Sequence, residues 1–517
     1  MSLYSYSKDH GSTSESPYGL TPYQLLAYWL CVSINRIWFH PLSKFPGPRL
    51  YSILSFPHLY YNYVKGTWVR NMPQLHQEYG PIVRIGPNHL SLDGSVAWPQ
   101  VFAHRGGGKA EFEKLPDFFY PDHGLSIISA PREVHRRMRR QMGHAFSDAA
   151  LIEQESIITS YVDLLMKRLN ERVEESQTFN IIDLFNFTTF DIIGDLVFAD
   201  PFHSLKNNDY HPWVLSIFNG VRGNAFNRFC RAYPPLRFFT ERFTLRDFGT
   251  SLETRQLARS KAMARMELGA EPRDGRRDFM TYMMRKTRDG EQGMSDTEIL
   301  ANSPTLVVAG SETTATALSG LFFFLSTNPE AYNALMAEIR SSFANQEDIT
   351  MRSTATLEYL HACIEETLRM YPPVAEVPPR VSPGDFIDGK FVPAGTRISV
   401  YQWVTFRSPA NFTDPDCFRP ERWLGPTHPR HDAKFVNDNK SAFKPFSHGS
   451  RDCIGKNLAY AEMRLIISRI LYQFDYAIAQ GQSNWQREQR AFMIWDKGPL
   501  RVNLMLRKNH QSLSSYI

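Results

Sequence analysis

One stretch of this sequence, residues 295–327, predicts a helix long enough to cross an entire domain. Ser295-Asp296-Thr297-Glu298 forms a capping box, in which the serine and glutamate side chains satisfy each other's free backbone N–H groups. An apolar run follows as far as Phe324, and Asn328-Pro329 ends it. About 32 residues at 1.5 Å each make a helix about 48 Å long. Such a helix must lie at the centre of the fold, with the rest of the chain packed around it.

The remaining pattern predicts a mostly α-helical protein of the α+β class. Helical periodicity dominates residues 130–375, whereas strand-like segments occur near 81–93 and 386–404. A minor sheet built from both ends of the chain favours one large helical domain with a small β-rich region. The stretch 270–292, which is rich in lysine, arginine and aspartate, is typical of a surface loop.

Charge and cysteine content exclude several classes of function. The 517 residues carry a formal net charge of only +5, which does not suggest the dense basic surface that binds nucleic acid. The cysteines are scattered without a C-x-x-C pair, which argues against a disulfide framework and a zinc ribbon. They are Cys31, Cys230, Cys363, Cys417 and Cys453. Their odd number leaves one thiol available for chemistry.

The first 50 residues predict a tail, an anchor and a hinge. Residues 1–38 would be a disordered tail followed by a membrane anchor. The apolar run from Leu20 to Ile34 is shorter than the about 20 residues that a spanning helix needs. An anchor that spans or lies in the interface, and a soluble helix docked on the body, both stay open. Prolines make residues 39–50 a stiff hinge, and the main body would occupy 51–517.

A second segment predicts contact with a membrane. Aromatic residues alternate with arginines between Phe226 and Phe239, a composition that suits the headgroup boundary. Pro234-Pro235 favours an exposed loop. The alternative is that these aromatic side chains belong to the core of packed helices.

A ten-residue pattern around one cysteine carries the strongest chemical signal. It reads Phe446-Ser447-His448-Gly449-Ser450-Arg451-Asp452-Cys453-Ile454-Gly455. Gly449 allows a tight backbone turn, and Gly455 allows close approach to a flat cofactor. A helix pattern starts just afterwards, and a helix N-terminus favours a thiolate at Cys453. A structural cysteine in a glycine-rich turn is the alternative, which the complete pattern disfavours.

This pattern resembles the haem-binding signature of the cytochrome P450 family, F-x-x-G-x-R-x-C-x-G, at every fixed position. The resemblance implies the cytochrome P450 fold and haem b (iron protoporphyrin IX) as the cofactor. It implies that Cys453 is the axial iron ligand, whose thiolate favours O–O cleavage. Arg451 is implied to bind a haem propionate, and Phe446, Gly449 and Gly455 to complete the cofactor loop.

Two further motifs resemble the family's structural triad. Glu366-Thr367-Leu368-Arg369 places opposite charges on one helix face, and Phe418-Arg419-Pro420-Glu421-Arg422-Trp423 follows later. The family likeness implies that Glu366, Arg369 and Arg422 meet as a buried triad, because buried charges need mutual satisfaction. Spacing alone leaves open a surface pair of Glu366 and Arg369.

The motif Ala309-Gly310-Ser311-Glu312-Thr313-Thr314 lies within the long helix, where a buried helix should lack polar residues. Ala309 and Gly310 are small enough to let a planar cofactor and dioxygen approach. Similarity to the family implies that Glu312 and Thr313 relay protons to oxygen. Polar residues that break a buried pattern tend to be functional.

Three weaker matches concern the propionates. His135-Arg136-Arg137-Met138-Arg139 stands where many family members have W-x-x-x-R, so His135 replaces the tryptophan. The resemblance implies that Arg139, His135 and Arg380 contact propionates. A solvated basic helix face is the alternative for residues 135–139.

Together the resemblance implies a membrane-associated monooxygenase, most like filamentous-fungal members that act in secondary metabolism. It would sit on the endoplasmic reticulum membrane with its catalytic domain in the cytosol and insert one oxygen atom from O2 into a lipophilic small molecule. NADPH-cytochrome P450 reductase would supply electrons, attracted by basic clusters. These clusters contain Arg132, Arg136, Arg137, Arg140, Lys444, His448 and Lys456.

Segments 114–128, 213–229, 374–377 and 493–497 are expected to line the substrate pocket by the same analogy. Two other functions stay open. One is a haem-thiolate isomerase or dehydratase that needs no external O2, which the Glu312-Thr313 pair disfavours. The other is a non-catalytic haem-binding protein.

Overall fold

The computed structural model describes residues 21–507 except 120–123, 234, 237, 239–251, 272–274, 276 and 286–292. The disorder expected for residues 1–18 therefore lies outside the described residues. So do parts of three segments discussed above, 114–128, 226–239 and 270–292.

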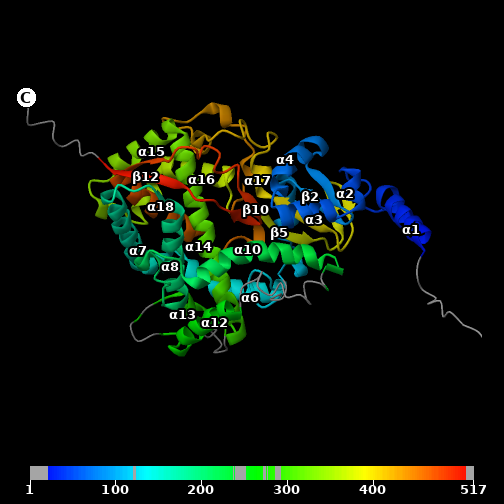
Figure 1. The fold of residues 1–517 in the computed structure, drawn as a ribbon, viewed down its shortest axis with the longest axis horizontal. Coiled ribbons are helices and arrows are strands. Elements are labelled where there is room, and N and C mark those ends of the chain that lie inside the picture. The colour runs from blue at the N-terminus through cyan, green and yellow to red at the C-terminus, as the bar shows by residue number, and fades with distance from the viewer. Residues whose placement is uncertain are drawn as a thin grey trace, which may run out of the picture.

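The long helix is α14 (Asp296–Thr327), and it runs through the middle of the helical part of the molecule (Figure 1). The Ser295 hydroxyl accepts from the Glu298 N–H, and the Glu298 carboxylate accepts from the Ser295 N–H. The predicted capping box, length and end at Asn328 are therefore confirmed. Pro304 lies inside the helix.

The other helices surround α14. The longer ones are α1 (Pro22–Ile34), α4 (Trp68–Tyr79), α6 (Arg132–Gly143), α7 (Asp148–Glu174), α8 (Ile181–Phe198), α10 (Pro212–Arg231), α12 (Leu252–Glu267), α15 (Pro329–Ser342), α16 (Glu358–Met370) and α18 (Lys456–Gln473). The short ones are α2 (Arg49–Ile53), α3 (Phe56–Tyr60), α5 (Gly94–Ala97), α9 (Ser204–Asn207), α13 (Phe279–Met284) and α17 (Gln402–Phe406).

The strands form small sheets beside the helical part, as the sequence predicted. The largest sheet has the order β1-β2-β8-β5-β3, in which β2 and β8 are parallel and the other neighbours antiparallel. Its strands are β1 (Ile82–Gly86), β2 (His89–Leu92), β3 (Glu113–Lys114), β5 (Glu376–Val381) and β8 (Arg397–Tyr401). The smaller sheets use β4 (Phe179–Asn180), β12 (Arg501–Leu506) and β9 (Phe474–Ile478), then β10 (Arg490–Phe492) with β11 (Ile494–Asp496), and β6 (Asp385–Ile387) with β7 (Lys390–Val392).

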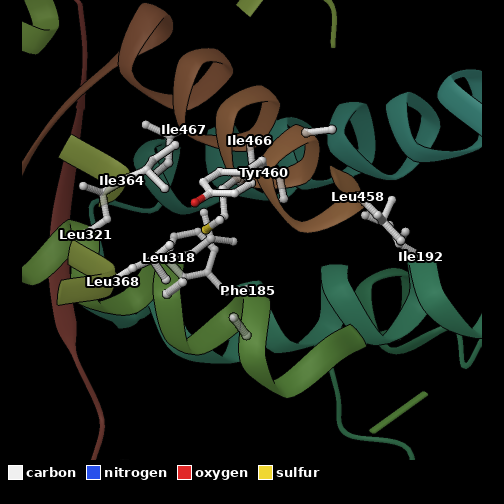
Figure 2. Close-up of a cluster of buried hydrophobic side chains, with 14 of the residues drawn as sticks. Phe185, Ile192, Leu318, Leu321, Ile364, Leu368, Leu458, Tyr460, Ile466 and Ile467 are labelled. Carbon is white, nitrogen blue, oxygen red and sulfur yellow. The ribbon is translucent and has the colours of Figure 1, made fainter. Parts of the chain in front are cut away.

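The hydrophobic core joins α8, α14, α16 and α18 (Figure 2). Its labelled members are Phe185 and Ile192 of α8, Leu318 and Leu321 of α14, Ile364 and Leu368 of α16, and Leu458, Tyr460, Ile466 and Ile467 of α18. Among the described helices, α14 alone is long and apolar enough to cross a bilayer, yet 78% of its apolar window is buried inside the protein. We therefore assign α14 to the protein core.

One loop prediction was wrong. Within 270–292, residues Phe279–Met284 form α13, whose first five residues are buried. Asp278 caps this helix by accepting from the Thr281 N–H, and it also pairs with Arg265 of α12 in the interior at 2.7 Å. The charged residues around α13 hid a short apolar run, Phe279-Met280 and Tyr282-Met283, which is enough to dock one helical turn on the core.

The N-terminal helix α1 projects from the end of the molecule that carries β2 (Figure 1). It has 13 residues, none of them buried, and the π-helix η1 (Asn35–Phe39) follows it. The proline-rich segment after it packs on the sheet. Leu42 and Phe45 are buried, and the Arg84 N–H of β1 donates to the Pro46 carbonyl over 2.7 Å. These contacts fix where α1 leaves the body.

The expected aromatic loop at 226–239 is largely helical where it is described. Helix α10 continues to Arg231, and Phe229 is buried in a small cluster with Leu59. The core alternative is therefore correct for this part of the segment. Leu236 and Phe238 remain exposed.

Candidate active site

Cys453 lies in a loop whose shape is set by two backbone contacts. The loop connects the 3-10 turn η12 (Gly449–Arg451) to α18. The Cys453 N–H donates to the Phe446 carbonyl over 2.8 Å. Gly449 has a φ of +80°, and a Cβ there would lie 1.9 Å from the Phe102 carbonyl oxygen. Only glycine fits this position, so Gly449 shapes the turn and does not line the cavity described next.

The Cys453 side chain is accessible from an internal cavity between α18 and α14. Burial raises the pKa of its thiol above the ordinary value, while the Gly455 N–H and the positive charge of Arg139 oppose that increase. A metal cation at the sulfur would favour the thiolate by the same electrostatic reasoning.

The cavity has a volume of about 290 Å³, and most of its wall is apolar. From α14 it is lined by Thr305, Leu306, Ala309, Gly310, Thr313, Thr314 and Ala317. The Cys453 loop and α18 contribute Phe446, Ile454, Gly455, Leu458, Ala459 and Met463. Ile127, Ile128, Val374 and Val377 come from loops and β5. The motif in α14 and the motif around Cys453 therefore share one cavity.

Gly310 also has a packing role that the sequence did not reveal. A Cβ at Gly310 would lie 2.8 Å from Cδ1 of Ile193, which belongs to α8. The absence of a side chain at Gly310 thus sets the distance between α14 and α8 as well as the width of the cavity.

Cationic side chains gather in the cavity wall: Lys114, Arg139, Arg380 and Arg451. Arg451 pairs with Glu111 at 2.7 Å, and Arg139 pairs with Asp452 at 2.7 Å. Burial and the neighbouring Arg451 lower the pKa of Arg380 to about 9. Burial and the arginines lower the pKa of Lys114 well below its ordinary value. A carboxylate placed in this part of the cavity would stabilise the charged form of both side chains.

His135 is buried beside these cations. Burial, followed by the charges of Arg451, Lys114 and Arg139, lowers the pKa of His135 to about 3. The imidazole is therefore neutral at pH 7 and is available as a hydrogen-bond donor rather than as a charge.

Glu312 and Thr313 point to different surroundings. Thr313 lines the cavity, and its hydroxyl donates to the Ala309 carbonyl over 2.7 Å. Glu312 is 3% exposed, does not line the cavity and forms an ion pair with Lys497. Thr314, which follows Thr313, forms a hydrogen bond with a second buried acid, Glu462 of α18. Burial raises the pKa of Glu462 to about 8. Glu462 lines the cavity, and its raised pKa favours the protonated form near pH 7, a feature that sequence spacing did not reveal.

The structure brings Glu366, Arg369 and Arg422 together. Both guanidinium groups lie within 3.0 Å of the Glu366 carboxylate, and all three side chains are completely buried. Arg369 also donates to the Phe406 and Pro415 carbonyls, and Arg422 pairs with Asp438. The triad thereby ties α16 to the irregular segment that leads to the Cys453 loop.

The matches to known proteins agree with this geometry. The family model "Cytochrome P450" matches residues 45–503. The chain belongs to the cytochrome P450 family. It is 40% identical to cytochrome P450 monooxygenase aclL of Aspergillus oryzae over 93% of this chain and 97% of that protein. It is 39% identical to the trichothecene C-15 hydroxylase of Fusarium sporotrichioides over 93% of this chain and 96% of that enzyme.

The residues present fit a haem, which the family implies. The cavity runs from the Cys453 thiol to the small residues of α14, and cations lie in its wall. The Arg380 Nε is buried and has no hydrogen-bond partner among the described residues. A haem propionate would supply the acceptor that this group lacks.

Two expectations about surrounding residues need correction. No residue of the fully described segments 213–229 and 493–497 lines the cavity, whereas Lys114, Ile127, Val374 and Val377 do. Arg137 is not free to attract a partner protein, because it pairs with Glu298 at the start of α14 and donates to the Gly293 carbonyl.

Replacing Arg369→Ala should destabilise the fold. The change leaves the buried Glu366 carboxylate with one partner fewer, which costs about 3–5 kcal/mol. The measurement is the free energy of unfolding in urea, with haem content as a second readout. Arg277→Ala is the matched control, because it removes an exposed pair with Glu153 and should cost less than about 1 kcal/mol. Equal losses for both variants would contradict a structural role of the triad.

Proposed function

We propose that this protein is a monooxygenase that inserts one oxygen atom of O2 into a lipophilic small molecule. The observation that carries the proposal is the shared cavity: the Cys453 thiol lies on one side and the Thr313 hydroxyl on the other. A haem-thiolate isomerase or dehydratase needs no proton relay to oxygen. The acid-threonine pair in α14 therefore favours monooxygenation.

Haem b is the proposed cofactor. Cys453 would ligate its iron through sulfur, and Arg451, Arg380, Arg139 and His135 would hold its propionates. Lys114 joins this set, because its amino group donates to the Ile128 carbonyl in the same cavity wall. When bound, the haem would supply the activation of dioxygen.

The chain's own residues would position substrate and move protons. Ile127, Val374 and Val377 present apolar surface, so binding would come from hydrophobic burial. Thr313 would hold a proton-carrying group in the cavity, and Glu312 would exchange protons with it. One oxygen atom leaves as water, so protons must reach the cavity in every turnover.

NADPH-cytochrome P450 reductase is the proposed electron donor. Arg136, Arg140 and Lys456 are exposed and would attract an acidic partner. We also propose, from the fungal relatives named above, that the protein acts in a secondary-metabolite pathway. One of these relatives is named as a hydroxylase of a trichothecene.

We infer that residues 1–38 include the membrane anchor, that 39–50 link it to the body, and that 51–517 form the catalytic domain. The support is the exposed apolar surface of α1 and η1, where Leu26 is 69% and Phe39 is 74% exposed. A surface of this kind needs a partner, and lipid suits it. The proposed site is the endoplasmic reticulum membrane, with the catalytic domain in the cytosol.

Metabolites that accumulate after deletion of the gene identify the substrate, and isotopic oxygen tests the reaction. With the reductase, NADPH and ¹⁸O₂, the product should gain one ¹⁸O atom. Thr313→Ala should raise the hydrogen peroxide formed per NADPH by roughly tenfold or more, because proton delivery fails. A product without the label would contradict monooxygenation, and unchanged peroxide would remove Thr313 from the relay.

Deleting residues 1–38 should weaken membrane binding without abolishing it. The exposed Leu236 and Phe238 provide a second contact with lipid. The measurement is co-sedimentation of the truncated protein with microsomal membranes at moderate and high salt. Serine at both positions should then remove the residual binding. A truncated protein that is fully soluble at both salt concentrations would rule out the second contact.

A further inference from the structure

Lys497 reaches Glu312 from a different part of the chain. It follows β11 and lies 185 positions away in sequence, yet its amino group pairs with Oε1 of Glu312. The same amino group donates to the Thr316 hydroxyl over 2.7 Å, and that hydroxyl lies 3.4 Å from the same Oε1. The side chains of Lys497 and Glu312 are 5% and 4% exposed. This ion pair is buried, so its charges depend on each other.

The other carboxylate oxygen of Glu312, Oε2, is not paired with Lys497. Oε2 is buried and has no hydrogen-bond partner among the residues that the structure describes. An unsatisfied buried acceptor costs about 1–3 kcal/mol, so any hydrogen-bond donor that reached Oε2 would be bound favourably. The two oxygens of Glu312 therefore differ: Oε1 is held by Lys497 and Thr316, whereas Oε2 has no hydrogen-bond donor among the described residues.

The backbone beside Lys497 is held firmly. Trp495 is buried, donates through its indole N–H to the Pro372 carbonyl over 2.8 Å and stacks on Tyr371 at 5.0 Å. Asp496 pairs with Arg222 of α10 at 2.6 Å. The backbone at Lys497 is therefore fixed, and the lysine side chain loses little further conformational freedom when it binds Glu312.

We propose that Lys497 is a positioning residue for the proton relay. It keeps Glu312 as a carboxylate and pins Oε1, so that Oε2 alone exchanges protons with the Thr313 side of α14. This inference rests on the proposed role of Glu312. Without Lys497, the buried carboxylate would have no cationic partner and would become neutral by binding a proton. A neutral, unpinned Glu312 no longer accepts protons for the next turnover.

The test compares Lys497→Met, Lys497→Arg, Glu312→Gln and the double variant Lys497→Met/Glu312→Gln in the haem-loaded, full-length protein. Lys434→Met is the matched control, because it removes an exposed lysine pair with Asp414. One readout is the peroxide formed per NADPH, measured with the reductase and with the metabolite that accumulates after deletion of the gene. The second is the infrared carbonyl band of a protonated carboxylic acid, which needs no turnover.

Lys497→Met should raise the peroxide fraction roughly tenfold, and Lys497→Arg should restore it largely. A carbonyl band additional to that of Glu462, which every variant retains, should appear in Lys497→Met and be absent from the double variant. The double variant should fold at least as well as Lys497→Met, because it leaves no lone buried charge. Its peroxide fraction should equal that of Glu312→Gln alone, since both changes act through one carboxylate.

Different results would overturn different claims. If Glu312→Gln matches the unmodified protein in peroxide, Glu312 is not part of the relay and the proposed function itself loses that step. If Glu312→Gln uncouples but Lys497→Met does not, only the role of Lys497 fails. A double variant whose peroxide fraction multiplies the two single effects would show that Lys497 acts independently of Glu312, which also overturns the inference.

Discussion

The buried carboxylate of Glu366 is the interaction on which the rest of the active site depends. The segment from Phe406 to the Cys453 loop contains short 3-10 turns in place of long helices or strands, so backbone hydrogen bonds alone hold it weakly. Arg369 and Arg422 connect α16 to this segment through Glu366, and the Trp423 indole adds a bond to the same carboxylate over 2.9 Å. Removal of either arginine leaves the buried Glu366 carboxylate with one cationic partner fewer, so the connection depends on both arginines.

A positioned Cys453 loop defines one wall of the cavity, and α14 defines the other. Small residues on α14, at Ala309 and Gly310, leave the space, and the hydrophobic core keeps α14 and α18 at a constant separation (Figure 2). The cavity is apolar except for cations such as Arg380 and the hydroxyls of α14. This distribution suits a cofactor that is hydrophobic in its body and acidic at its edge, together with an apolar substrate.

Local patterns in the sequence predicted the local structure well. The capping box and Asn328-Pro329 fixed both ends of α14, and Gly449 follows from a backbone turn that excludes other residues. Pairs between distant positions could not be predicted this way. Nothing in the spacing indicates that Lys497 meets Glu312 or that Glu111 meets Arg451, because tertiary packing decides those contacts. The buried helix α13 was missed because charged neighbours mask its short apolar run.

The central claim is that the Cys453 thiolate binds haem iron in the cavity beside α14. The most direct test is the absorption spectrum of the reduced protein with carbon monoxide, compared between the unmodified protein, Cys453→Ser and Cys417→Ser, whose cysteine is exposed and does not line the cavity. The account predicts the red-shifted Soret band of a thiolate-ligated haem in the unmodified protein and in Cys417→Ser, and its complete loss in Cys453→Ser. A full band in Cys453→Ser would contradict the account.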